Sequence, residues 1–197
     1  MKMKICPNSF TLTLFIAISA AHCFAAETII VESRKADGTL NTPAWSEAGG
    51  KWKTSKNKTR VAASSSLVAT NVSICATNIP APGFKISPEG LQANTTYRVE
   101  ATFGTSKTQS ASADLIVAIS VAGVSASTIP TNTPAFQASG ANAWNKLGTI
   151  TPSTSRPTLA FTYVSGTLSP VSRWYADAIR FTPETAPKKA DEKSQPQ

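Results

Sequence analysis

The chain has 197 residues and a formal charge of +8, from 19 Lys and Arg against 11 Asp and Glu. Charged residues make up 15% of the chain, below the ~25% of typical soluble domains. Hydrophobic residues, at 41%, are numerous enough for a packed core. These values exclude a disordered polyampholyte and indicate one domain, or at most one and a half.

The first 25 residues have the pattern of a secretory signal peptide. Lys2 and Lys4 precede an apolar stretch of 12 residues at 10–21, and small residues follow. The stretch is too short to cross a bilayer comfortably as an anchor. We therefore expect cleavage after Ala25, or one residue later. We also expect export, secreted or to the periplasm and cell envelope, with no stable membrane anchor afterwards.

Removing this segment changes which charged and reactive side chains remain in the chain. The remainder has 17 basic and 11 acidic residues, a charge of +6, no histidine, and Cys75 as its single cysteine. Nucleophiles that need an imidazole base are excluded, as are zinc sites built on His or several Cys, and an intramolecular disulfide. We expect no catalytic residues, and we expect Cys75 to be a small buried hydrophobe.

The remaining sequence predicts an all-β fold. In 97–103, Tyr97, Val99 and Phe103 alternate with polar residues, which is typical of a strand with one buried face. No segment after the signal sustains a helical period. Further strands are expected at 28–33, within 61–75, and at 113–121, 144–150, 158–164 and 174–181, with loops at 34–60 and 78–94.

Together these elements predict one antiparallel β-sandwich of jelly-roll type. Its expected limits are residues 26–183. Residues 184–197 have no apolar periodicity and are expected to form a disordered tail.

Several motifs follow one another in an informative order. Trp52 follows a glycine pair, and the strands include Tyr97-Arg-Val-Glu-Ala101, Trp144-Asn-Lys-Leu-Gly148 and Ala176-Asp-Ala-Ile-Arg-Phe181. This order resembles the golvesin/xanthan-lyase carbohydrate-binding-like domain, an exported bacterial β-sandwich module. One departure is Asn94, which stands where that family has a glycine. The resemblance implies a jelly-roll-like sandwich with a binding or adhesive role rather than an enzymatic one.

Two of the four tryptophans are candidates for sugar binding. Trp45 and Trp52 lie in the polar segment expected to be a loop, and exposed aromatic rings stack on the apolar faces of sugars. The alternative is core packing, which is the commoner role of large aromatic side chains. Trp144 and Trp174 lie in expected strands and are interpreted as mostly structural. Partial exposure is left open for Trp174, which alternates out of phase with Ile179 and Phe181.

A basic stretch surrounds Trp52. Its cations favour contact with an anionic partner such as an acidic polysaccharide, a lipopolysaccharide or a negatively charged surface. A solvated loop is the alternative, and nucleic acid is disfavoured for an exported protein without a recognisable nucleic-acid-binding fold. The candidate binding residues in this stretch are Lys51, Lys53, Lys56, Lys58 and Arg60.

Asp177 is expected to point inward, because it alternates in phase with Ile179 and Phe181. A buried carboxylate needs hydrogen-bond donors or a cation. Backbone N–H groups or an arginine are one solution. The other is a structural calcium ion with Glu32 as the second ligand, an arrangement similar to that of calcium-stabilised jelly-roll carbohydrate modules. No other cofactor is required.

The leading hypothesis is an exported, non-catalytic module that binds carbohydrate or an anionic cell-surface polymer. A structural or adhesive surface-assembly protein without sugar affinity is the first alternative. The second is a small polysaccharide-active enzyme that uses carboxylates, because a glycosidase needs two acids ~5–10 Å apart. Sequence does not place the acids relative to one another. The candidates are Glu32, Asp37, Glu47, Glu89, Glu100, Asp114 and Asp177.

Overall fold

The computed structural model describes residues 26–56, 71–103, 110–134 and 143–184. These residues form fourteen strands and no helix, which confirms the all-β fold. The described part of the chain accordingly has no helix long and apolar enough to cross a membrane. The expected signal peptide at 1–25 and residues 185–197 of the expected tail lie outside the described residues.

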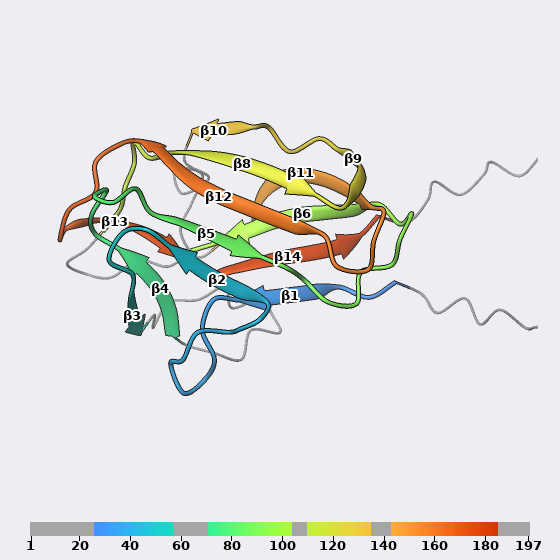
Figure 1. Ribbon diagram of the computed structural model, residues 1–197, viewed down its shortest axis with the longest axis horizontal. Coiled ribbons are helices and arrows are strands. Elements are labelled where there is room, and N and C mark those ends of the chain that lie inside the picture. Colours follow the sequence, from blue (N-terminus) through green and yellow to red (C-terminus); the bar gives the residue numbers. More distant parts are fainter. Residues whose placement is uncertain (1–25, 57–70, 104–109, 135–142, 185–197) are drawn as a thin grey trace, which may run out of the picture.

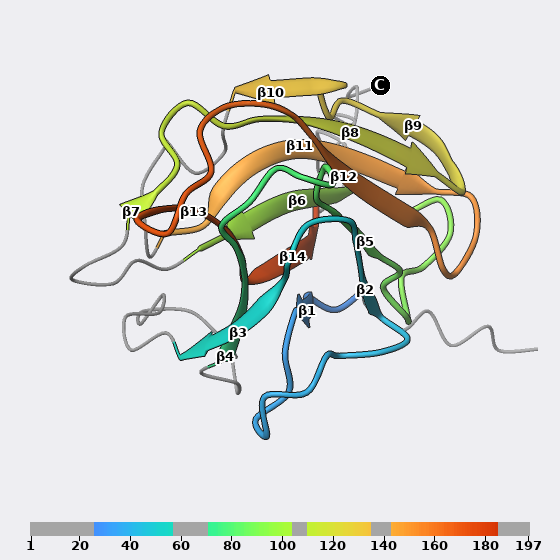
Figure 2. The ribbon, with the colours of Figure 1, turned by 60° about the vertical axis from the view of Figure 1, so that its left-hand side comes forward.

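Two five-stranded antiparallel sheets face each other and make a β-sandwich (Figures 1 and 2). The first sheet has the order β1 (Ile29–Glu32), β14 (Ala178–Pro183), β6 (Tyr97–Thr102), β11 (Asn145–Pro152), β9 (Val124–Ser127). The second has the order β10 (Asn132–Pro134), β8 (Ile116–Ala122), β12 (Thr158–Ser165), β5 (Gly83–Ile86), β2 (Trp45–Ala48). The predicted sandwich is confirmed, and its jelly-roll type stays a prediction.

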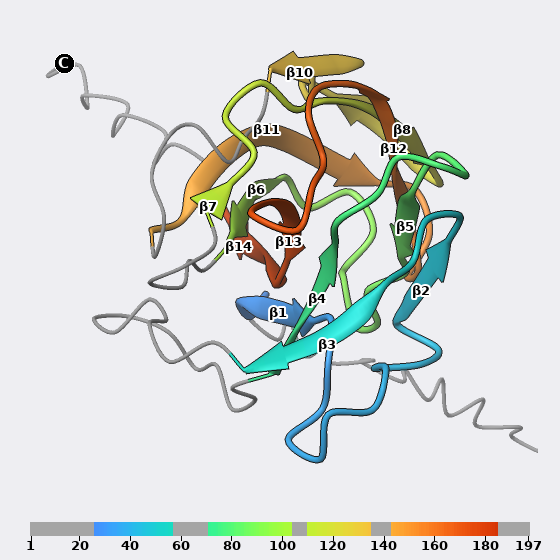
Figure 3. The ribbon, with the colours of Figure 1, turned by 90° about the vertical axis from the view of Figure 1, so that its left-hand side faces the viewer.

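A third sheet closes one end of the sandwich (Figure 3). It is antiparallel except for the pair β13 and β7, which run parallel. Its order is β3 (Lys53–Lys56), β4 (Asn71–Cys75), β13 (Ser172–Ala176), β7 (Ser110–Ala111). At Asp177 the chain passes from β13 in this sheet to β14 in the first sheet.

The core lies between the two large sheets and beneath the third. Tyr97 and Val99 are fully buried and Phe103 nearly so, as their alternation predicts. Phe84 stacks on Trp45 with ring centroids 4.6 Å apart and on Phe161 at 4.5 Å. Such offset ring pairs add to the gain from burying apolar surface.

Three sequence expectations about regular structure were wrong. The expected loop 34–60 contains β2 and β3, and the expected loop 78–94 contains β5. These strands have four residues each and little apolar alternation, so their pairing partners rather than their own pattern stabilise them. The expected strand 174–181 is two strands. Because the chain changes sheets at Asp177, alternation does not carry across it. Trp174 is fully buried, which fits its interpretation as a structural residue.

The structure explains the departure at Asn94. This residue has φ 63°, a left-handed conformation that glycine adopts freely and asparagine tolerates better than most residues. Asparagine is therefore compatible with the backbone conformation of the turn before β6.

The described chain enters and leaves the sandwich at the same end. β1 and β14 are antiparallel neighbours, with Ile29 opposite Phe181. The start of β1 and the end of β14 therefore lie side by side, at the end opposite the third sheet (Figure 1).

Candidate functional site

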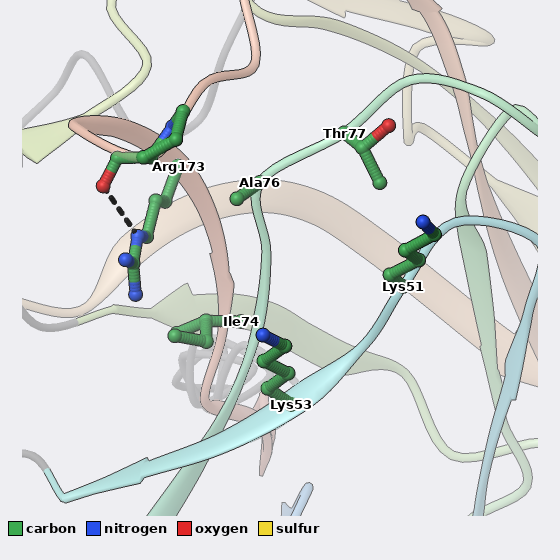
Figure 4. Close-up of a pocket in the computed structure, with 7 residues that line it drawn as sticks. Lys51, Lys53, Ile74, Ala76, Thr77 and Arg173 are labelled. Carbon is green, nitrogen blue, oxygen red and sulfur yellow. Dashed lines mark hydrogen bonds between the residues drawn. The ribbon is translucent and has the colours of Figure 1, made fainter.

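A pocket of ≈ 240 Å³ lies on the outer face of the third sheet. Figure 4 shows Arg173 on one side of it and Lys51 and Lys53 on the other, with Ile74 and Ala76 between them. Cations and apolar side chains thus share one small hollow. The lining residues are Lys51, Lys53, Ile74, Ala76, Thr77, Pro170 and Arg173.

Strand register places these side chains on one face. Lys53 pairs with Ile74, and Ile74 pairs with Tyr175. Residues two apart on a strand share a face, so Arg173 lies on the same face as Tyr175. The same rule puts Ala76 on the face of Ile74.

The intervening residues point the other way, into the core. Trp174 pairs with Cys75, and both are fully buried. Trp52 precedes β3, and its ring centroid lies 5.4 Å from that of Trp174. The aromatic side chains of Trp52 and Trp174 therefore point inward, whereas the cations next to them in sequence, Lys51, Lys53 and Arg173, line the pocket.

A tight turn fixes the position of Lys51. Gly49 and Gly50 both have φ 57°, the left-handed region that favours glycine. A Cβ on Gly49 would lie 1.9 Å from the carbonyl oxygen of Ala81. The Gly50 amide donates a hydrogen bond to the Pro80 carbonyl at 2.7 Å. The glycine pair thus lets the chain reverse closely against the segment that leads into β5.

Arg173 is held by the loop that precedes it. Its Nε donates a hydrogen bond of 3.0 Å to the carbonyl of Pro170. Two further hydrogen bonds hold the loop. The Ser169 amide donates to the Ser172 carbonyl at 2.7 Å, and the Ser172 amide donates to the Ser169 Oγ at 3.0 Å. The guanidinium plane is therefore oriented by the protein itself.

Asp114 braces the start of this loop. Its carboxylate accepts hydrogen bonds from the Thr167 amide at 3.0 Å, the Thr167 Oγ1 at 2.8 Å and the Ser112 Oγ at 2.9 Å. Hydrogen bonds to the charged form favour it. The Thr167 amide, followed by the two hydroxyls, lowers the pKa of Asp114 from 3.8 to about 2. The brace is consequently ionised at any neutral pH.

The electrostatics of the pocket are one-sided. Lys51, Lys53 and Arg173 line it, and its lining includes no acidic side chain from the described part of the chain. Within the described residues, Lys51 and Lys53 form no ion pair, and Glu47, Glu89 and Glu100 are paired with arginines. A hollow lined by three cations attracts an anion.

The basic stretch predicted from sequence is divided by the fold. Lys51 and Lys53 line the pocket. Lys56 is exposed on β3 but does not line it, and Lys58 and Arg60 lie outside the described residues. Arg173 was missed, because it is distant in sequence and follows no basic run. The pairing of β13 with β4 was the one feature that could have revealed it.

The two aromatic candidates, Trp45 and Trp52, differ in their burial. The placement of Trp45 in an exposed loop was wrong: it lies on β2, is fully buried and stacks on Phe84. A ring without exposed surface offers no platform to a sugar. Trp52 is half-buried against Trp174 and Phe84, and its Nε1 donates to the Ala48 carbonyl at 3.2 Å. It does not line the pocket, and its role in binding stays a prediction.

Strand pairing brings the backbones of the two acids expected to hold calcium close together. Glu32 pairs with Ala178, the residue after Asp177, and the Ser33 amide donates to the Asp177 carbonyl at 2.7 Å. Both acids are buried, as expected for Asp177. In the described ranges, no group of three or more His, Cys, Asp or Glu could hold a metal ion. Calcium binding at this pair stays a prediction.

Comparisons with known proteins bear on the fold. No family model matches the sequence, and no curated protein matches it either. Among solved structures, the fold is similar to part of a Paenibacillus xanthan lyase, with a TM-score of 0.55 and 15% sequence identity over 81% of this chain. The chain spans 13% of the length of that lyase. The likeness shows a related fold, and membership of the golvesin/xanthan-lyase family stays a prediction.

Proposed function

We propose that this protein is an exported, non-catalytic binding module that holds an anionic polysaccharide at the pocket of Lys51, Lys53 and Arg173. The observation that carries the proposal is the convergence of three cations, from two separate parts of the chain, on a single hollow whose described lining residues include no acid. Anionic polymers are attracted to such a site over a distance and are then retained by charge-assisted hydrogen bonds.

Three further observations support this function. The resembling structure is an enzyme named for a polysaccharide, which favours a carbohydrate-related module. The pattern of residues 1–25 favours export, where extracellular polysaccharides are found. Glycoside hydrolysis needs a pair of carboxylates, whereas the residues that line this pocket include none. Binding without cleavage therefore fits the pocket better than glycoside hydrolysis does.

The test is a set of titrations at low and high salt against a panel of acidic and neutral polysaccharides. We expect the wild-type protein to bind acidic polymers, with an affinity that falls as salt screens the charges. The triple variant Lys51→Ala/Lys53→Ala/Arg173→Ala should lose at least about tenfold in affinity, because charge-assisted hydrogen bonds are lost.

Lys56→Ala is the matched control. Lys56 lies on β3, as Lys53 does, but it does not line the pocket, so the variant removes one lysine charge outside the pocket. It should leave the affinity nearly unchanged. Equal losses in Lys56→Ala and in the single pocket-lysine variants would mean that net charge, not the pocket, attracts the polymer. Absence of binding to every polysaccharide at both salt concentrations would favour the structural or adhesive alternative.

Release of unsaturated or shortened products from a bound polymer would contradict the non-catalytic part of the proposal.

Trp52→Ala tests whether Trp52 takes part in binding. If Trp52 acts through the core, this variant should lower thermal stability while the affinity of the folded protein stays within about twofold. A selective loss of affinity would restore the sugar-stacking role.

A further inference from the structure

We infer that the pocket accepts one uronate residue, a sugar whose ring carries a carboxylate, and that Arg173 is the residue that recognises the carboxylate. This inference rests on the proposed function and names its ligand class. It distinguishes carboxylated polysaccharides from sulfated ones, which the proposed function alone does not.

The size of the pocket is the first argument. Sites for drug-sized ligands have volumes of about 300–1,000 Å³, and this pocket has ≈ 240 Å³. It is therefore suited to one sugar ring rather than to several consecutive rings. The remaining residues of a polymer would lie outside the hollow, across its rim.

The composition of the lining is the second argument. Ile74, Ala76 and Pro170 give the pocket an apolar surface beside the cations. A small inorganic anion has no apolar part to cover this surface. A pyranose ring has apolar C–H groups on its faces, and a uronate joins its carboxylate directly to the ring. The ring can rest on the apolar residues while the charge reaches the cations.

The geometry of Arg173 is the third argument. A guanidinium presents its donors in a planar fork that matches a planar carboxylate in a bidentate pair. Because Nε is held by the Pro170 carbonyl, the plane of this fork is set before a ligand arrives. A side chain that is already oriented loses less conformational entropy on binding. A sulfate ester is tetrahedral and holds its charge farther from the ring, so it matches this arrangement less well.

The surface around the pocket fits a polymer that continues beyond it. Ile79 and Val171 are 77% and 63% exposed, the two most exposed large apolar side chains of the described residues. Val171 directly follows the pocket residue Pro170, and Ile79 comes two residues after Thr77. They offer apolar contacts next to the hollow, where neighbouring sugar rings would lie.

Calorimetric titration with three probes tests this inference. The probes are a short oligogalacturonate, the same oligomer with its carboxylates methyl-esterified, and a dextran sulfate of similar length. We expect the oligogalacturonate to bind at least about tenfold more tightly than its methyl ester, because charge-assisted hydrogen bonds are lost. It should also bind more tightly than dextran sulfate at equal ionic strength.

Arg173→Lys keeps the charge and removes the fork. We expect it to weaken oligogalacturonate binding by about tenfold while leaving dextran sulfate binding within about twofold, because the fork's advantage is specific to carboxylates. Lys85→Ala, a charge loss on β5 in the second sheet, should change neither affinity. Thermal melts of each variant check that the fold is retained.

The results distinguish failure of the uronate inference from failure of the proposed function. If oligogalacturonate and dextran sulfate bind equally well, and Arg173→Lys weakens neither, the uronate inference is overturned while the anionic-polysaccharide function survives. Equal binding of the methyl ester would likewise overturn it. If neither charged probe binds, and the polysaccharide panel is also negative, the proposed function fails with it.

Discussion

At the scale of single residues, Arg180 illustrates how one side chain serves the fold. It lies between Ile179 and Phe181, which are buried in the core. Its own side chain points to the other face, where its guanidinium contacts Glu100 at 2.7 Å and lies 4.3 Å from the centre of the Trp144 ring. Both members of the ion pair are nearly buried, at 13% and 10% exposure.

Arg180→Ala should therefore destabilise the protein strongly. The substitution removes the contact with Trp144 and leaves Glu100 with the longer contact to Arg98, at 3.5 Å. Breaking a buried ion pair from one side costs about 3 kcal/mol in free energy of unfolding. Urea denaturation measures this loss.

The double variant Arg180→Met/Glu100→Leu is the control, because it removes both charges together. It should cost less than the sum of the two single substitutions. Additive losses would show that the pair itself contributes little.

Sequence predicted individual site residues unevenly. Lys51 and Lys53 were found because they belong to a conspicuous basic run. Trp45 was misplaced because its neighbours are polar, whereas its burial depends on pairing with β5. Arg173 was missed because its contribution depends on the register of β13 against β4. Short-range pattern identifies what a residue is, and long-range pairing decides where its side chain lies.

At the scale of elements, the β12–β13 loop determines the shape of one side of the pocket. It supplies Pro170 to the lining and orients Arg173. The hydrogen bonds of Asp114 hold its first residues. The long strands β6 and β12 were predicted from their alternation, whereas this loop and the short strand β3 had no such pattern.

We expect Asp114→Asn to reveal this brace through pH. The folded-state pKa of Asp114 lies below its usual value of 3.8, at about 2. Its ionised form therefore stabilises the folded state above pH 3.8, and this contribution is lost as pH falls toward 2. The difference in melting temperature between wild type and variant should be constant near neutral pH and shrink through this interval.

Asp37→Asn is a suitable comparison, because Thr39 likewise lowers the pKa of Asp37 but this acid does not contact the β12–β13 loop. Only Asp114→Asn should also weaken polysaccharide binding. An unchanged difference in melting temperature across the acid range would contradict the brace.

At the scale of the whole molecule, the described part is a sandwich whose third sheet covers the open end of the core. The all-β class and the sandwich were predictable from short alternating strands. The third sheet was not, because it assembles strands from four separated parts of the sequence. Cys75 lies on its inner face, fully buried, and its Sγ donates to the Thr77 carbonyl at 3.1 Å.

Cys75 should thus report on opening of the entire domain. In protein that begins at Ala26, it is the single thiol, and reagents should modify it at a rate that follows global unfolding. Raising urea should raise the labelling rate in proportion to the unfolded fraction. Rapid labelling in native buffer would show instead that the third sheet opens on its own.

The side-by-side course of β1 and β14 has a mechanical consequence. Tension applied between the two ends of the described chain would open these neighbouring strands one hydrogen-bonded pair after another, the weakest direction for a sheet. Tension between a polymer held on β13 and the end of β14 would run along the chain through Asp177 and load β14 in shear against β1 and β6. We expect the domain to resist pulling by its ligand better than pulling by its ends.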